Sequence, residues 1–119
     1  TLGTYKTGLY KEYLDKSMIP IVLPPEPLAE KVHAAIYHSV TGIKAGSNPV
    51  SSEARQIIED AVRALGQQGA HAVVLGCTEL PIALPSESLD GITLIDPAAI
   101  LARALIRETY PEKLKPLSG

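Results

Sequence analysis

A short apolar run, Ala72–Leu75, ends at Gly76 and leads directly into Cys77, the single cysteine of the 119-residue chain. The run contains two valines, and such β-branched runs are typical of a strand buried on both faces of a parallel sheet. Ligands of open parallel sheets bind beyond the carboxyl ends of the strands, where backbone N–H groups of the next turn are free. We therefore expect Cys77 at a sheet rim to which a ligand has access.

Two interpretations of Cys77 are open at this point. Free cysteines are commonly buried and behave as small hydrophobic side chains. The alternative is a functional thiol whose pKa is lowered by a helix N-terminus or by exposed amides, which makes it a base or a nucleophile. The polar neighbours Thr78 and Glu79 favour the functional interpretation, because a cysteine placed for packing would more naturally lie within the apolar run.

The composition limits the class of protein. A chain of 119 residues with 45% hydrophobic and 20% charged residues is ordinary for one globular domain. The formal net charge of −2, without a cluster of Lys or Arg, gives no sign of a nucleic-acid partner. We also expect no membrane partner, because no apolar run reaches the roughly 18 residues of a span and no signal peptide is visible. The lone cysteine fits a reducing cytoplasm, where we expect the protein.

The remaining hydrophobic patterns predict an α/β chain in which helices flank a small, mostly parallel sheet, as in a three-layer sandwich. Helix 98–107 should pack through Ile100, Leu101, Ala104 and Leu105. The helix that Ser51 or Ser52 caps should return the chain to the cysteine-bearing strand in a right-handed βαβ-like unit. The expected strands are 19–23, 72–75 and 92–95, and the expected helices are 8–16, 28–40, 52–65 and 98–107.

Three other polar features of the sequence are candidates for a functional role. Thr4 and Thr7 form a turn before the first helix, where their hydroxyls can cap the helix, contact a carboxylate, or both. Lys44 is the only charged residue of the glycine-containing loop 41–50, and a lone loop lysine is usually solvated. The histidines at 33 and 38 are too far out of phase to share a helix face, so we expect surface histidines and no metal site.

Four motifs occur in order along nearly the whole chain, and together they carry a family resemblance. They are Thr4–Thr7 after Leu2-Gly3, Ile36-Tyr37 through Gly42–Gly46, Gly76–Leu80, and Ile95–Pro97. This set resembles the aspartate/glutamate racemase family. The resemblance implies an α/β racemase domain that inverts an acidic amino acid without pyridoxal phosphate or any other cofactor.

The mechanism implied by the resemblance uses two thiols. Inversion at an α-carbon requires one group to remove the proton from one face and a second group to deliver a proton to the other face. A thiolate is a base and a thiol is an acid, so a pair of cysteines suffices. Cys77 would be the acid/base for one face.

The resemblance also implies how the substrate is held. Thr4 and Thr78, with Thr7 as a further candidate, would bind the α-carboxylate or the amine, and backbone N–H groups at the strand end would help. Lys44 would bind the distal carboxylate of aspartate or glutamate. Glu79 would accept a hydrogen bond from the substrate ammonium or orient the thiol, and a glutamate there favours the aspartate branch, since glutamate racemases often carry histidine.

Racemases of this type resemble two-domain proteins with one cysteine from each half, whereas this chain carries one in total. Leu2–Thr4 is typical of the end of a strand, so we expect residues 1–119 to be the C-terminal domain of a longer racemase, inactive alone. Residues 92–110 would then pack against the missing N-terminal half, and the full-length protein would form a homodimer. The alternatives are a related carbanion enzyme, such as a decarboxylase or hydantoin racemase, and a non-catalytic ligand-binding or dimerising domain.

Overall fold

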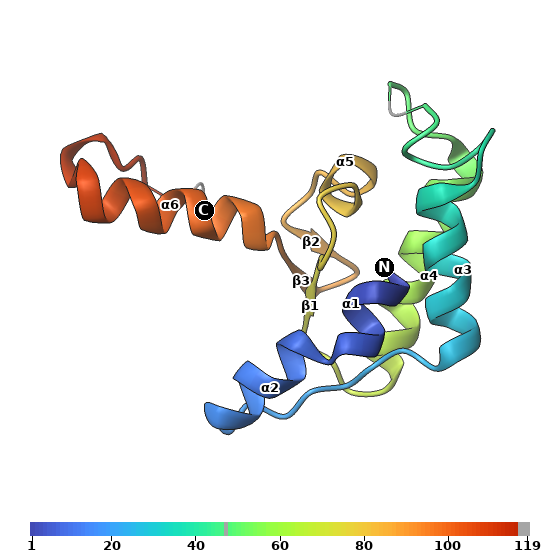
Figure 1. Cartoon of the computed structure of the whole chain (residues 1–119), viewed down its shortest axis with the longest axis horizontal. Coiled ribbons are helices and arrows are strands. Elements are labelled where there is room, and N and C mark those ends of the chain that lie inside the picture. Colours follow the sequence, from blue (N-terminus) through green and yellow to red (C-terminus); the bar gives the residue numbers. More distant parts are fainter. Residues whose placement is uncertain (47, 117–119) are drawn as a thin grey trace.

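The computed structural model describes residues 1–46 and 48–116. Position 47 of the predicted loop 41–50 and positions 117–119 of the predicted domain therefore lie outside the described residues. Helices lie on both sides of a small central sheet, which confirms the α/β prediction (Figure 1). In chain order the elements are α1 (Leu2–Thr7), α2 (Leu9–Lys16), α3 (Glu26–Tyr37), α4 (Ser52–Gln67), β1 (Ala72–Val74), α5 (Leu80–Ala83), β2 (Ser88–Leu89), β3 (Ile92–Ile95), α6 (Pro97–Thr109) and the 3₁₀ helix η1 (Pro111–Lys113).

The sheet of the described chain has the strand order β1-β3-β2. Strands β1 and β3 are parallel, with Ala72 opposite Thr93, whereas β2 and β3 form an antiparallel hairpin. Asp90 and Gly91 connect the hairpin, and both have positive φ angles, 51° and 81°, as tight two-residue turns require. Asp-Gly is a turn signal in the sequence, but β2 is too short for its own pattern to predict it.

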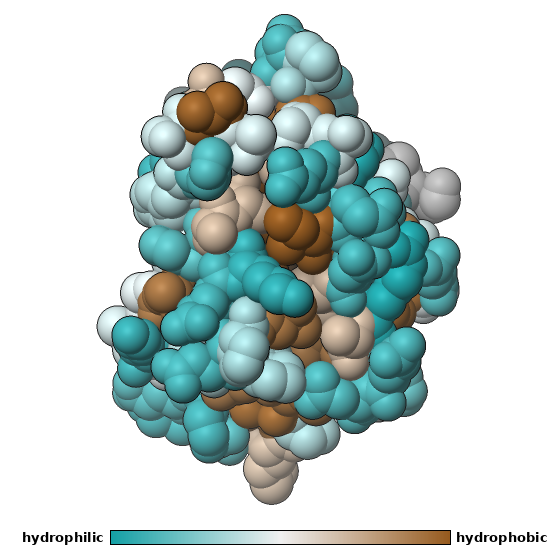
Figure 2. Space-filling model, turned by 90° about the vertical axis from the view of Figure 1, so that its right-hand side faces the viewer, coloured by the Kyte–Doolittle hydropathy of each residue, from teal (hydrophilic) through white to brown (hydrophobic). Residues whose placement is uncertain are grey.

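The core lies where α3 and α4 pack on each other and on β1. Ile36 of α3 and Ile43 of the following loop are almost completely buried, at 0% and 1% exposure. Helix α4 contributes its predicted apolar face, and Ser51 accepts a hydrogen bond from the Ala54 amide as its N-cap. The outer face of this pair is covered mainly by polar side chains, with small apolar patches between them (Figure 2).

Two predictions about the N-terminal part are wrong. Leu2–Thr7 forms helix α1 rather than a strand end and a turn, because the Thr1 hydroxyl caps it by accepting from the Thr4 amide. Segment 19–23 is extended but is not a strand, since no backbone hydrogen bond of the described chain involves residues 20–24. Pro20 and Pro24 lack an N–H group, so this segment has few donors for a ladder. The βαβ-like unit therefore does not form as predicted.

The C-terminal helix has the predicted position but not the predicted packing. Helix α6 projects away from the rest of the molecule (Figure 1), and Ile100, Leu101 and Leu105 are 56%, 61% and 58% exposed. Ala104 is only half-buried. The spacing of these residues correctly predicts one apolar face, but no part of the described chain covers it. Among the described residues no helix is both long and apolar enough to cross a bilayer.

Candidate active site

Cys77 lies in the tight turn that follows β1 and precedes the short helix α5. The amides of Gly76 and Cys77 donate to the carbonyls of Val74 and Leu75, at 2.9 and 2.8 Å. These two amides are therefore not free for a ligand, contrary to the prediction from the sequence. A Cβ at position 76 would lie 3.1 Å from Cε2 of Tyr10, so this close approach favours glycine.

The Cys77 thiol belongs to a cluster centred on the Glu79 carboxylate. Cys77 Sγ donates to Glu79 Oε2 at 2.7 Å, and Thr78 Oγ1 donates to the same oxygen at 3.1 Å. Lys44 Nζ lies 3.3 Å from the other oxygen, Oε1, in a salt bridge. The structure thus brings four of the six predicted site residues together, three from the sheet rim and one from the loop after α3.

The position of Lys44 follows from the way its loop is tied to α3. The amides of Ile43 and Lys44 donate to the carbonyls of Ala35 and Ile36, at 2.9 and 3.0 Å. Gly42 makes this geometry possible, because a Cβ there would lie 2.5 Å from the backbone oxygen of His38. Lys44 is therefore on a loop whose backbone is fixed to the core, rather than on a freely solvated one.

Tyr37 also belongs to this site, although its contact with Lys44 was not predicted from the sequence. Lys44 Nζ lies 4.6 Å from the centre of the Tyr37 ring, within the range of a cation–π interaction. The motif that includes Ile36-Tyr37 was the available signal, but nothing in the spacing indicates that the ring folds back beneath the lysine. Tyr37 in turn lies against His33, with ring centres 4.7 Å apart.

The two threonines of α1 differ in their relation to the site. Thr4 Oγ1 donates to the carbonyl of Gly76 at 3.2 Å, which places this helix beside the residue that precedes the cysteine. Thr7 is exposed, and its hydroxyl donates to the carbonyl of Thr4 at 3.3 Å. Thr4 therefore borders the cluster, whereas Thr7 has a local role within its own helix.

The cluster determines the charges of its members. Hydrogen bonds, first of all from the Cys77 thiol, lower the pKa of Glu79 to about 2. Burial raises the pKa of Cys77, and the hydrogen bond to Glu79 raises it further. The hydrogen bond to Glu79 also raises the pKa of Lys44. At neutral pH the cluster consequently holds a protonated thiol, a carboxylate and an ammonium. The lowered thiol pKa, which was one of the two interpretations left open by the sequence, is not found.

The histidines take part in local structure. His33 is half-buried rather than on the surface, and its Nδ1 accepts from the Leu2 amide at 3.4 Å. His38 is exposed, and its Nδ1 accepts from the Thr41 amide at 3.1 Å. Within residues 1–46 and 48–116, no group of three or more His, Cys, Asp or Glu side chains is arranged to hold a metal ion.

Two comparisons with known proteins relate this chain to racemases. The family model described as Asp/Glu/Hydantoin racemase matches residues 1–105. A glutamate racemase from Deinococcus radiodurans is 31% identical over 81 residues, which are 66% of this chain and 28% of that protein. The chain thus spans little more than a quarter of the length of this relative. No solved structure matches the chain significantly.

Proposed function

Because the chain belongs to the Asp/Glu/hydantoin racemase family, we propose that it supplies one of two catalytic cysteines for cofactor-independent racemisation of an acidic amino acid, aspartate in the first place. The observation that carries this proposal is the cluster of Cys77, Glu79 and Lys44 at the rim of the sheet. It combines a proton carrier with one anion and one cation, which are complementary to the charges of an amino acid with a second carboxylate.

In this proposal Cys77 acts first as a general acid. The protonated state of its thiol, hydrogen-bonded to Glu79, supports this direction of proton transfer. A thiolate from the remainder of the racemase removes the α-proton on one face, breaking the Cα–H bond. The Cys77 S–H bond then breaks as its proton is delivered to the opposite face, which leaves the Cys77 thiolate and a protonated second thiol. The reverse reaction starts from that state.

The Lys44–Glu79 salt bridge is the basis for the proposed substrate. A distal carboxylate can replace Glu79 as the partner of Lys44, while the substrate ammonium becomes the partner of Glu79. Each charge then keeps an opposite charge beside it, so binding leaves no ion unpaired. A hydantoin lacks the distal carboxylate and the ammonium group that this exchange requires.

The threonines would complete the binding of the α-carbon substituents. The Thr4 hydroxyl donates to the Gly76 carbonyl and accepts from the Thr1 hydroxyl, which leaves one lone pair for the substrate ammonium. The Thr78 hydroxyl is exposed and can rotate from Glu79 toward the α-carboxylate. Thr7 has no part in the proposal, because its hydroxyl is engaged within α1.

The proposed activity requires more polypeptide than this chain provides. We propose that the chain is the C-terminal domain of a longer, homodimeric, cytoplasmic racemase and that residues 92–110 pack against its N-terminal half. The exposed apolar side chains of α6 support this arrangement, since Ile100, Leu101 and Leu105 would be covered there. The chain alone would then lack the second thiol and be inactive.

The direct test follows exchange of the α-proton of aspartate in deuterated water by NMR, with the complete racemase polypeptide. We expect exchange of aspartate, slower exchange of glutamate, and a loss of roughly 10²-fold or more on Cys77→Ser, as for removal of an acid/base group. Thr7→Ala is the matched control and should leave the rate unchanged. Exchange at the wild-type rate in Cys77→Ser would remove this thiol from the mechanism.

A second measurement tests the substrate assignment. Lys44→Met should raise KM for aspartate by about tenfold or more, because one charge-assisted contact is lost. Turnover of a 5-substituted hydantoin in place of aspartate would reassign the enzyme within the same family. Binding of aspartate by the complete protein without any proton exchange would favour the non-catalytic alternative.

A further inference from the structure

The Lys44 ammonium has two partners within residues 1–46 and 48–116. The Glu79 carboxylate lies 3.3 Å from Nζ, and the centre of the Tyr37 ring lies 4.6 Å from it. Both partners raise the pKa of Lys44, Glu79 first. In the proposed exchange of partners, a substrate carboxylate replaces Glu79. The Tyr37 ring is then the contact that remains, so it decides where the ammonium lies while a substrate is bound.

The contact between Lys44 and Tyr37 is not a by-product of helical spacing. Lys16 also lies over a tyrosine ring, that of Tyr13, at 5.2 Å, but these two residues are one turn apart in α2. Neighbours at that spacing share a helix face, so such a stack forms without tertiary structure. Lys44 belongs instead to the loop after α3, and its amide donates to the carbonyl of Ile36 at 3.0 Å. The return of this loop onto α3 creates the contact.

The Tyr37 ring is itself supported from behind. Tyr37 is the last residue of α3, and His33 lies one helical turn before it, with ring centres 4.7 Å apart and planes inclined by 33°. His33 is half-buried, and its Nδ1 accepts from the Leu2 amide at 3.4 Å. The ring is therefore held in place on one side although 48% of Tyr37 is exposed. It can serve as a platform for a flexible lysine side chain.

We propose that Tyr37 is a positioning residue of this site, whose ring holds the Lys44 ammonium at the sheet rim while a substrate displaces Glu79, and thereby favours aspartate over glutamate. The inference rests on the proposed racemase function for its substrate, whereas the ring contact exists without turnover. Tyr37 acts through Lys44 rather than on the reacting atoms. We therefore expect its effect on substrate affinity and selectivity, and not on the rate of proton transfer.

The preference for the shorter substrate follows from the geometry around Glu79. Cys77 Sγ and Lys44 Nζ contact the two oxygens of this one carboxylate, at 2.7 and 3.3 Å. The proton carrier and the partner of the distal carboxylate are thus separated by a single carboxyl group. This short span suits aspartate, whose side chain has one methylene fewer than that of glutamate. An ammonium held at the ring does not withdraw to admit the extra methylene, whereas a lysine on its flexible stem without the ring does.

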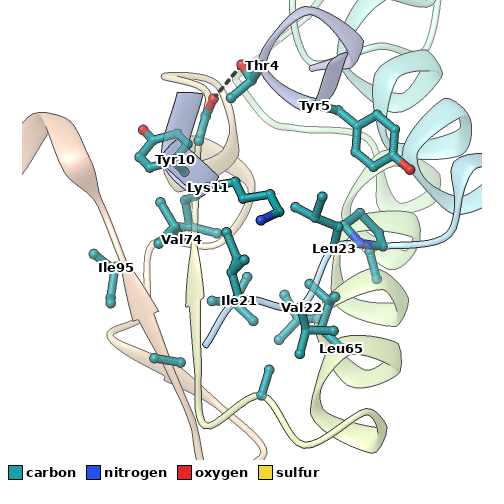
Figure 3. A pocket seen from close by; sticks show the side chains of 18 of the residues that line it. Thr4, Tyr5, Tyr10, Lys11, Ile21, Val22, Leu23, Leu65, Val74 and Ile95 are labelled. Atoms are coloured by element: carbon teal, nitrogen blue, oxygen red, sulfur yellow. Dashed lines mark hydrogen bonds between the residues drawn. The ribbon is translucent and has the colours of Figure 1, made fainter. Parts of the chain in front are cut away.

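A large apolar cavity of the described chain does not compete for this substrate. Its volume is about 630 Å³, and neither Tyr37 nor Cys77 lines it. Figure 3 shows mostly apolar side chains around it, such as Val74 of β1, with Lys11 among them. Lys11 already forms a salt bridge with Asp15. An acidic amino acid would lose its hydration in such a cavity without gaining an unpaired opposite charge, so it binds at the charged cluster instead.

The test compares Tyr37→Leu, which removes the ring, with Tyr37→Phe, which keeps it, in the complete racemase polypeptide. Because Tyr37 is 48% exposed, both variants should keep the melting temperature within about 2 °C of the parent protein. Tyr37→Leu should raise KM for aspartate about two- to fivefold, as for the loss of one exposed cation–π contact, with kcat within about twofold. The kcat/KM preference for aspartate over glutamate should fall in Tyr37→Leu, and Tyr37→Phe should retain the parent values.

The matched control is Tyr13→Leu. This variant removes the ring beneath Lys16 of α2, which is a contact of the same kind away from the cluster. It should leave KM, kcat and the preference for aspartate unchanged.

An NMR measurement tests the ring contact independently of turnover. The signal of the Lys44 ε-methylene group, identified by its absence in Lys44→Met, should be shifted upfield by the ring current of Tyr37. The shift should vanish in Tyr37→Leu and persist in Tyr37→Phe. Titration with aspartate, followed at the same signal, gives Kd, which should rise about two- to fivefold in Tyr37→Leu.

Each other result is decisive. An unshifted Lys44 signal in the parent protein would overturn the proposal, as would equal KM and Kd for aspartate in the parent and in Tyr37→Leu. A fall in kcat alone would mean a structural role for Tyr37, and equal losses in Tyr37→Phe and Tyr37→Leu would transfer the effect from the ring to the hydroxyl. Absence of α-proton exchange in the parent protein, with aspartate binding that still depends on the ring, would reject the racemase function and support the positioning role.

Discussion

Helices α4 and α6 carry the same kind of sequence pattern and end up in opposite environments. Both have an apolar face, and both are capped by a side chain, Ser51 for α4 and Asp96 for α6. Yet Ile58 of α4 is 2% exposed, whereas Ile100 of α6 is 56% exposed. The comparison shows that helical periodicity specifies which face is apolar but not what covers that face.

The physical difference is the set of neighbours rather than the helix itself. Helix α4 contacts α3, β1, β2 and α5, whereas α6 packs mainly against the short η1 that follows it. Fully burying a large aliphatic side chain stabilises a fold by about 1.5–3 kcal/mol. The apolar face of α4 therefore holds the body together, while that of α6 remains available for another surface.

The largest expected effect comes from the same substitution in both helices. Ile58→Ala should lower the free energy of unfolding by about 2–5 kcal/mol, because it leaves a cavity in the core. Ile100→Ala should change it by less than about 0.5 kcal/mol, as for an exposed residue. Urea unfolding followed by circular dichroism measures both. Equal losses would mean that α6 is packed in solution.

A smaller loss of stability should distinguish two glycines of the Lys44 loop, one packed closely against α3 and one in open space. Gly42→Ala should cost about 1–3 kcal/mol, since the added methyl group meets the His38 backbone at 2.5 Å. Gly46→Ala is the control, because nothing lies within 4 Å of a Cβ at that position. Thermal unfolding of the two variants gives the comparison, and a similar melting temperature for both would contradict the attachment of this loop to α3.

Removing the N-cap of α4 should lower the global stability more than removing the N-cap of α6. Ser51→Ala should reduce the global free energy of unfolding by about 1 kcal/mol, as the loss of an N-cap usually does. Asp96→Ala removes a comparable cap, but we expect only faster amide exchange at the start of α6 without a change in global stability. Hydrogen exchange combined with urea unfolding separates the two results. A global loss from Asp96→Ala would show that α6 is coupled to the core.

The smallest expected effect is a shift in the pKa of the Cys77 thiol. Glu79→Gln removes the negative charge and the carboxylate acceptor that favour the protonated thiol, so the pKa of Cys77 should fall. The rate of alkylation by iodoacetamide should then reach its midpoint at a lower pH than in the unmodified chain. Glu108→Gln, on the exposed α6, is the matched control and should leave the midpoint in place. A rise in the midpoint would contradict the role of Glu79.

The site itself could be predicted only in part. Cys77, Thr78 and Glu79 are neighbours in the chain, so their proximity required no knowledge of the fold. The contact of Glu79 with Lys44 depends on the packing of α3 against the body, and the position of Lys44 over Tyr37 depends on the loop that folds back onto α3. The direction of the Cys77 pKa also came from the fold, because it depends on burial and on which oxygen accepts the thiol proton.

The sequence alone determined the short-range features of this protein: strand β1 with its glycine stop, the capped amphipathic helices, the Asp-Gly turn and the family motifs. These follow from periodicity, capping and turn chemistry, which act over a few residues. Only the tertiary structure decided that segment 19–23 stays unpaired, that α6 stays uncovered and that Lys44 reaches Glu79. A strand needs a partner edge and an apolar helix needs a second surface, and no local pattern states where either partner lies.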